Sequence, residues 1–206
     1  GFIDPRGEMV IEPIYNEALD FSDGLAAVNL KSVYGEWGFI DPAGKMIIQP
    51  RFHRAYSFHD GLARAMPKEG GGFGLIDKSG EYVISKSESR RKEGGAEITT
   101  TTWYVPGDFG CGVAPVSFRG DLFLVDQKGK KVTKNLPFRQ IGQFVEGLAS
   151  YVEGESFGYL DPSGKVVITA QYAEAGDFQN GIAMVMSETE TAYIDRRGRT
   201  VWKGAK

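Results

Sequence analysis

The sequence has few of the residues and runs that mark several common classes of protein. Its single cysteine, Cys111, excludes an internal disulfide framework. Its only histidines are His53 and His59, and a metal site built on two histidines needs further ligands. The longest apolar runs, such as Ile182–Met186, have about five residues, whereas a membrane-spanning helix needs about 20. We therefore expect no metal centre and no membrane insertion.

A surplus of positive charge is also missing. Among 206 residues there are 24 Lys and Arg and 27 Asp and Glu, so the formal net charge is −3. Surfaces that bind nucleic acid or anionic membranes normally carry a basic excess. The composition therefore argues against nucleic acid as a partner.

Glycine is abundant, with 28 residues spread along the chain. Such a distribution is typical of many short strands separated by tight turns. A motif of two apolar residues followed by Asp-x-x-Gly occurs six times, and consecutive copies lie 34 to 37 residues apart except for one gap of 49. Its aspartates are Asp4, Asp41, Asp77, Asp126, Asp161 and Asp195. The sequence therefore contains a regular internal repeat, which indicates a repeat architecture.

The chemistry of this motif predicts a hairpin turn. An aspartate at the first turn position accepts hydrogen bonds from backbone amides, proline at the second fixes φ, and glycine at the fourth adopts a left-handed conformation. Between two apolar runs this pattern predicts a type I turn with a glycine bulge. We therefore expect the six aspartates to be structural, neither catalytic nor metal-binding.

A second motif, Phe-x-x-Gly followed by an apolar strand, keeps step with the first. Its phenylalanines are Phe21, Phe58, Phe109, Phe144 and Phe178. Together the motifs predict five to six three-stranded antiparallel meanders, joined by connectors whose aromatics pack between successive sheets. The expected fold class is all-β, an open superhelical stack of small sheets. The alternative is a propeller-like ring of three-stranded blades.

The spacing predicts one domain over residues 1–206. The expected repeats cover 1–37, 38–73, 74–122 with an insertion at 85–108, 123–157, 158–191 and a partial 192–206. Because the chain starts within a repeat, we expect it to be a piece of a longer protein whose targeting segment, if any, lies upstream. Unpaired edge strands at the ends of an open array would favour end-to-end association.

The combined pattern resembles the WG-repeat (KWG-repeat) family of bacterial proteins. Trp37-Gly38 is an intact WG dipeptide, Phe73-Gly74 and Phe157-Gly158 replace the tryptophan by another aromatic, and Leu122-Phe123 and Thr191-Ala192 have lost both letters. The resemblance implies a repeat-built binding or scaffolding module. It carries no shared catalytic residues, so it implies neither enzymatic activity nor a cofactor.

The regular spacing of the repeats is interrupted in the segment Ser85–Phe109, which accounts for the gap of 49 residues. Long departures from a repeat usually map to surface loops, and loops on rigid scaffolds often carry function. This segment contains Arg90 and Arg91 and ends near Trp103 and Tyr104, residue types that are enriched in binding hot spots. These four residues are the predicted binding site. The alternative is a flexible loop followed by an irregular strand whose Trp103 and Tyr104 fill the core.

Three other features have simpler structural interpretations. His53 and His59 are expected to face solvent from a connector. Cys111 is expected to be a partly buried thiol beside a turn. The glycine-rich stretch Glu69–Gly74 lacks the Gly-Lys-Ser/Thr ending of a phosphate loop, and predicts a long hairpin loop.

The sequence favours a non-enzymatic module that binds another protein or a peptide. The alternative is an envelope-associated domain that binds glycan or cell wall. That alternative predicts solvent-facing aromatics at one position in every repeat, whereas the recurring aromatics here have the pattern of core residues. The partner, the compartment and the oligomeric state have no signature in the residues.

Overall fold

The computed structural model describes residues 1–30, 36–69, 71–93 and 96–205, apart from the side chains of 87, 89–100, 103 and 205. These residues form strands and turns. No helix among them is long and apolar enough to cross a membrane. The chain divides into two compact units, Gly1–Pro106 and Gly107–Lys206. The expectation of one domain over 1–206 stays a prediction.

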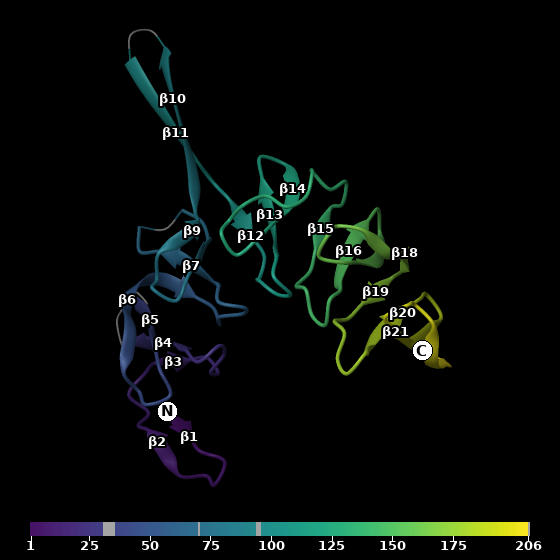
Figure 1. The fold of residues 1–206 in the computed structure, drawn as a ribbon, viewed down its shortest axis with the longest axis horizontal. Coiled ribbons are helices and arrows are strands. Elements are labelled where there is room, and N and C mark those ends of the chain that lie inside the picture. The colour runs from purple at the N-terminus through teal and green to yellow at the C-terminus, as the bar shows by residue number, and fades with distance from the viewer. Residues whose placement is uncertain (31–35, 70, 94–95, 206) are drawn as a thin grey trace. The chain divides into compact units, whose positions relative to one another are not determined.

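The first unit holds strands β1 to β12 (Figure 1). β1 (Phe2–Ile3) and β2 (Met9–Ile11) pair as a hairpin, and β10 (Lys86–Glu93) and β11 (Ala96–Trp103) form a second two-stranded sheet. β12 (Val105–Pro106) ends the unit. A seven-stranded antiparallel sheet contains β3 (Glu17–Ala18), β4 (Ala26–Leu30), β5 (Glu36–Ile40), β6 (Met46–Ala55), β7 (Ala63–Pro67), β8 (Gly74–Ile76) and β9 (Tyr82–Ile84).

The seven-stranded sheet consists of two repeats that share β6. The first half of this ten-residue strand pairs with β5, as in Phe39↔Ile48. Its second half pairs with β7, as in Ala55↔Ala65. The fourth strand of the first repeat therefore continues directly into the first strand of the second.

The second unit holds three more repeats. β13 (Ala114–Phe118) pairs with β14 (Asp121–Val125). A four-stranded sheet follows, with β15 (Gln140–Ile141), β16 (Ala149–Glu153), β17 (Ser156–Leu160) and β18 (Val166–Tyr172). The last repeat has β19 (Glu174–Ala175), β20 (Ile182–Met186), β21 (Glu190–Asp195) and β22 (Thr200–Ala205). Below, the repeats that carry Phe21, Phe58, Phe109, Phe144 and Phe178 are called the first to the fifth.

Each predicted meander gains a short additional strand from its connector. Glu17–Ala18 pairs with Asn29 and Val28, and Glu174–Ala175 pairs with Met186 and Val185 in the same way. The sequence pattern shows the three longer strands, because a two-residue strand has no periodicity to detect. The predicted all-β repeat array is confirmed, and the first, second, fourth and fifth repeats have four strands where three were expected.

The six aspartate turns have the predicted chemistry. In every turn the aspartate Oδ1 accepts the backbone amides two and four residues later, at 2.8–3.2 Å. The turn glycines have φ between 75° and 84°, the left-handed region that glycine tolerates best. A hydrogen bond from the Ser79 hydroxyl, helped by backbone amides, lowers the pKa of Asp77. The charged carboxylates hold the turns.

A close backbone approach explains the glycine of the WG dipeptide. Opposite Gly38 the register shifts from Trp37↔Phe52 to Phe39↔Ile48, so β6 bulges towards β5. A Cβ at Gly38 would lie 2.6 Å from the carbonyl oxygen of Ile48, and one at Gly158 would lie 2.5 Å from that of Ile168. Only glycine fits at this position without movement of the neighbouring strand.

The core lies between successive repeats. Strand side chains alternate between two sheet faces; we call the face that packs on the following repeat the forward face and the opposite one the backward face. In the fourth repeat the forward face carries Leu148, Tyr159 and Ile168. It packs on a backward face of the fifth repeat that carries Phe178, Ala183, Val185 and Ile194. The Tyr159 and Phe178 rings lie 4.9 Å apart, matching the 4.8 Å between Phe39 and Phe58 in the first unit.

The Phe-x-x-Gly turns form a second link between repeats. Their two central residues both have positive φ, for example Glu146 at 51° and Gly147 at 85°, as in the type I′ turns of two-residue hairpins. In three repeats the side chain of the first central residue accepts an amide from the same turn of the next repeat. These contacts are Asp23 to Gly61 (2.7 Å), Cys111 to Gly147 (3.2 Å), and Glu146 to Asn180 (2.7 Å) and Gly181 (2.9 Å).

Cys111 differs from its expected environment. The thiol was expected to be partly buried, but Cys111 is exposed, because it occupies the tip of one of these turns at φ 52°. Its Sγ contacts the amide of Gly147 and the carbonyl of Phe144. The cysteine therefore serves in the link between repeats.

Replacing Gly38 by alanine should destabilise the first unit by about 1–3 kcal/mol, the usual cost of forcing extra atoms into a packed site. The added Cβ would meet backbone atoms of β6, which cannot turn aside as a side chain can. Urea unfolding curves measure the change. Gly176→Ala is the matched control, since its nearest contact is 3.4 Å away. Equal losses in the two variants would contradict the explanation.

Replacing Glu146 by alanine should speed amide hydrogen exchange at Asn180 and Gly181, which the carboxylate holds. The ion pair with Arg196, together with these amide bonds, lowers the pKa of Glu146. The protection is therefore complete above the unfolded pKa of about 4.3. It is lost as the pH falls through the lower folded value, where parent and variant should converge.

Glu155→Ala, at an exposed loop position, is the control for this exchange experiment. It should leave both amides unchanged. If the parent and Glu146→Ala exchanged equally at neutral pH, the link between the fourth and fifth repeats would not depend on this carboxylate.

Candidate functional site

The first unit contains a hollow of about 240 Å³ beside the aspartate turn of the second repeat. β6 supplies Arg51 and Phe52, β7 and the segment after it supply Pro67 and Glu69, and the turn and β9 supply the rest. Its lining includes Arg51, Phe52, Pro67, Glu69, Glu81 and Tyr82. We call it the Arg51 pocket.

The floor of the Arg51 pocket is aromatic. Phe52 is almost fully buried, and the Tyr82 ring meets it edge-on at 6.1 Å. Burial raises the pKa of Tyr82 to about 12, although the nearby Arg51 cation opposes this rise. The phenol therefore stays neutral at physiological pH and acts as a largely apolar surface.

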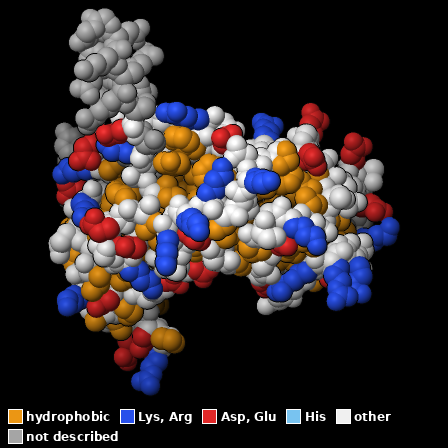
Figure 2. Space-filling model, turned by 45° about the horizontal axis from the view of Figure 1, so that its top comes forward, with side chains coloured by type: hydrophobic (Ala, Val, Ile, Leu, Met, Phe, Trp, Pro, Cys, Tyr) orange, Lys and Arg blue, Asp and Glu red, His pale blue; other side chains and the backbone are white. Residues whose placement is uncertain are grey.

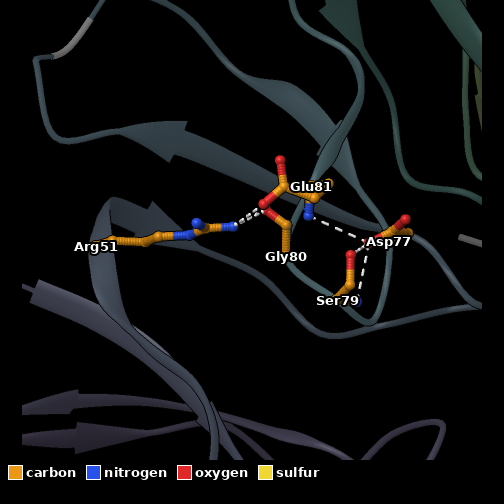
Figure 3. A network of polar contacts seen from close by, with 5 residues as sticks. All are labelled: Arg51, Asp77, Ser79, Gly80 and Glu81. Atoms are coloured by element: carbon orange, nitrogen blue, oxygen red, sulfur yellow. Dashed lines mark hydrogen bonds and ion pairs between the residues drawn. The ribbon is translucent and has the colours of Figure 1, made fainter.

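The rim of the pocket is polar and braced. Arg51 donates a hydrogen bond to the carbonyl oxygen of Gly80 and lies 3.0 Å from a carboxylate oxygen of Glu81 (Figure 3). Asp77 holds both acceptors in place by accepting the amides of Ser79 and Glu81. The guanidinium also lies 5.4 Å from the centre of the Phe52 ring. A repeated turn thus positions an arginine beside an aromatic floor.

The same sheet carries a cluster of arginines and aromatics. The guanidinium of Arg64 lies 4.4 Å from the ring centre of Tyr56 and 5.7 Å from that of Phe73, and Arg54 lies 5.6 Å from Tyr56. The two rings are 5.5 Å apart. We call these four residues the Arg–aromatic cluster. Arginine and tyrosine are residue types that dominate binding hot spots.

Sequence reasoning missed both features. The connector that contains Arg51, Arg54 and Tyr56 was interpreted only as core filler between sheets. Arg64 meets Tyr56 because the second half of β6 pairs with β7, where the amide of Tyr56 donates to Arg64. The missing information was that strand β6 continues into the second repeat. The arginines beside the connector aromatics were visible in the sequence.

Three residues of the predicted site in the insertion, Arg90, Arg91 and Trp103, lie on a regular hairpin, and Tyr104 follows it. β10 and β11 pair without interruption from Lys86↔Trp103 to Glu93↔Ala96, whereas the alternative expectation was a flexible loop with an irregular strand. Ile98 and the four threonines that follow it favour strand structure, which explains the difference. The side chains of Arg90, Arg91 and Trp103 lie outside the described residues, and Tyr104 is half-buried. A binding role for these four residues stays a prediction.

The remaining candidates from the sequence are the two histidines and the glycine-rich stretch Glu69–Gly74. Among the described residues no group of three or more His, Cys, Asp or Glu side chains is placed to hold a metal ion. His53 is exposed and His59 is half-buried. The stretch Glu69–Gly74 connects β7 and β8, apart from Gly70, which lies outside the description.

Four of the five recurring phenylalanines are core residues, as predicted, and Phe21 is half-buried against the core. Phe58, Phe109, Phe144 and Phe178 are at most 2% exposed. A glycan-binding array was expected to present aromatics to solvent at one position in each repeat. A second hollow in the second unit, of about 520 Å³, has a polar lining that includes Glu155, Gln171 and Glu188. Neither feature supplies the stacking platforms that the glycan alternative requires.

Comparison with solved structures shows an all-β repeat fold that resembles β-propellers. The chain is similar to Hsv2 from Kluyveromyces marxianus, with a TM-score of 0.54 and 10% identity over 89% of this chain and 59% of that one. It is also similar to Kluyveromyces lactis Hsv2, with a TM-score of 0.51 and 11% identity over 90% and 62%. Both are WD40-like β-propeller structures, of which this chain spans about three-fifths. The choice between an open stack and a ring stays a prediction.

In sequence, no curated protein matches the chain. A family model does match, the WG containing repeat, at residues 1–34, 37–70 and 157–188. These three matches begin at or beside Gly1, Trp37-Gly38 and Phe157-Gly158. Each of these positions lies at the start of a strand, namely β1, β5 and β17. With the repeated turns and the all-β repeat fold, these matches at three places in the chain support a WG-repeat family.

Proposed function

We propose that this chain is a non-enzymatic scaffold module that binds a protein or peptide through the Arg51 pocket and the neighbouring Arg–aromatic cluster. The observation that carries the proposal is the Arg51 pocket, an aromatic floor with a braced polar rim. The all-β repeat fold, which resembles β-propellers, supports it, because repeat arrays offer extended rigid surfaces without a shared chemistry.

The size of the pocket favours a side chain over a whole small molecule. Sites for small ligands usually enclose about 300–1,000 Å³, whereas this hollow has about 240 Å³. One large apolar residue of a peptide would cover Phe52 and Tyr82. The Arg51 guanidinium and the Glu81 carboxylate at the rim would then meet the polar groups beside that residue.

The Arg–aromatic cluster extends this surface. Stacked guanidinium groups and rings lose little conformational freedom on binding, so they contribute affinity at low entropic cost. Arg54 is exposed at the edge of the cluster. We therefore propose a partner segment with one large apolar residue and an acidic residue near it.

Two features support the non-enzymatic part of the proposal. The repeated turn aspartates are occupied by backbone amides, and the pKa of Asp77 beside the pocket is lowered. A general base works best with a pKa near the operating pH, and this carboxyl is shifted the opposite way. On the face drawn in Figure 2, hydrophobic, basic and acidic side chains are interspersed, a mixture that suits protein partners.

Selection from a displayed library of random peptides tests the proposal. We expect enriched peptides to share a large apolar residue and a nearby acid. Arg51→Glu and Tyr56→Ala should each weaken the selected peptide by about tenfold or more, as hot-spot residues do. Fluorescence polarisation with a labelled peptide measures the affinity.

Arg139→Glu is the matched control, since it reverses an exposed arginine in the other unit. It should leave the affinity unchanged. A library that yields no shared sequence, or equal binding by all three variants, would refute the assigned site.

A Trp103→Ala/Tyr104→Ala variant tests the insertion independently. If the Arg51 pocket is the site, this variant keeps its affinity once circular dichroism shows that it is folded. Loss of the peptide by this variant, with binding kept by Arg51→Glu, would move the site to the β10–β11 hairpin.

A further inference from the structure

The hairpin of β10 and β11 is a two-stranded sheet that no other strand joins within the described residues (Figure 1). Its opposed pairs run without a bulge from Lys86↔Trp103 to Glu93↔Ala96. A two-stranded ribbon is at best marginally stable in water, and a third strand or a covering element is normally needed. The hairpin therefore has two long edges of backbone groups along which a further strand would stabilise it.

Other edge strands of the protein are protected against such pairing. β2, β9, β18 and β22 each lie at an edge of their sheet, and the register of each with its neighbour is shifted. A bulge bends and twists an edge strand, so another strand pairs along it less readily. β10 and β11 have no such shift, and so they keep the regular edges that the repeats lack.

One hydrogen bond determines which backbone groups of β11 face outwards. The amide of Tyr104 donates to the carbonyl oxygen of Ser85 at 3.0 Å, so these two residues form a hydrogen-bonded pair. Hydrogen-bonded and non-hydrogen-bonded pairs alternate along an antiparallel ladder. The residues of β11 whose backbone groups therefore face away from β10 are Glu97, Thr99, Thr101 and Trp103.

The residue types along the two edges differ. β10 carries six charged residues among its eight, whereas β11 carries Glu97 as its one charged residue. Charges on an edge strand are a common protection against pairing. β11 has instead Ile98 followed by four threonines, residue types that favour strand structure. The edge of β11 is therefore the one suited to a further strand.

The sequence of β11 is complementary to itself. In a symmetric antiparallel pair with its two-fold axis at Thr100, Thr99 lies opposite Thr101 and Ile98 lies opposite Thr102. Opposed threonines are a favourable cross-strand pair. The one charged residue of β11 lies opposite Trp103, so this register opposes no like charges.

The sequence of β10 is not complementary to itself in this way. A two-fold axis at Arg90 would place the two arginines opposite one another. An axis at Ser89 would place Lys86 opposite Lys92. Like charges directly opposite each other destabilise a sheet, so a second copy is expected at β11.

We propose that two copies of this chain pair antiparallel along β11, so that their hairpins form one four-stranded sheet with its two-fold axis at Thr100. Both copies use the same edge, so the contact is isologous and closes at two copies. The hydrogen bonds come from the outward backbone groups of β11. The contact uses residues separate from the Arg51 pocket and goes beyond the proposed peptide binding.

Charges at the two-fold position test the pairing by complementation. Thr100→Lys and Thr100→Glu each oppose two like charges, so each should raise the dissociation constant of the dimer about fivefold, the upper range for one cross-strand pair. An equal mixture should restore association, because lysine then lies opposite glutamate. Ser89→Lys is the matched control, since Ser89 lies opposite Thr100 within the hairpin but on β10. It should associate as the parent does.

Proline substitutions test the backbone edge. Thr101→Pro removes an amide that faces the open edge of β11, and proline cannot donate to a new ladder. It should raise the dissociation constant by about tenfold or more. Glu88→Pro is the matched control, because Glu88 lies opposite Thr101 and its amide faces the other edge. Sedimentation over a range of concentrations measures the association, and circular dichroism checks that each variant is folded.

Hydrogen exchange on the unsubstituted protein needs no variant. The amides of Thr99 and Thr101 should gain protection as concentration rises, whereas those of Glu88 and Arg90 should not. A parent that stays monomeric throughout would overturn the proposal and leave the edge to an extended segment of another protein. Equal weakening by the two proline variants, or a Thr100→Lys and Thr100→Glu mixture that associates no better than either alone, would also refute it.

Discussion

The structure depends on the burial of each small sheet between its two neighbours. A sheet of three or four short strands has two faces and cannot bury both by itself. Here the alternation of side chains along each strand sends Leu148 to the following repeat and Ala149 to the preceding one. Because every repeat needs a neighbour on both sides, stability belongs to pairs of repeats more than to single ones. The repetition in the sequence is the direct result of this requirement.

The hairpin turns add a polar link to that apolar stack. A non-glycine residue at positive φ is strained, and asparagine or aspartate tolerates it best. Cys111 and Glu146 adopt that conformation nevertheless, at φ 52° and 51°. Each is compensated by the amide that its side chain accepts from the next repeat. Local strain and contact between repeats are thus coupled at one position, which explains why its residue type varies while an acceptor atom is kept.

The sequence predicted the parts of the fold that local chemistry determines. The six aspartate turns and the buried phenylalanines could be predicted because each depends on a few adjacent residues with one favourable arrangement. The Arg51 pocket could not, because Arg51, Pro67 and Tyr82 come from three strands whose register follows from the shared strand β6. The β10–β11 hairpin was missed for a different reason, since its charged first half has no apolar alternation and was therefore interpreted as loop.

The shared strand β6 also constrains how such a gene can change. The fourth and fifth repeats are joined at Ala173, between the separate strands β18 and β19. A duplication or deletion with its boundary there leaves both sheets whole. The first and second repeats have no such break between strands, because any boundary between them cuts a continuous ten-residue strand. Recombination within this array should therefore keep the first two repeats together and gain or lose copies elsewhere.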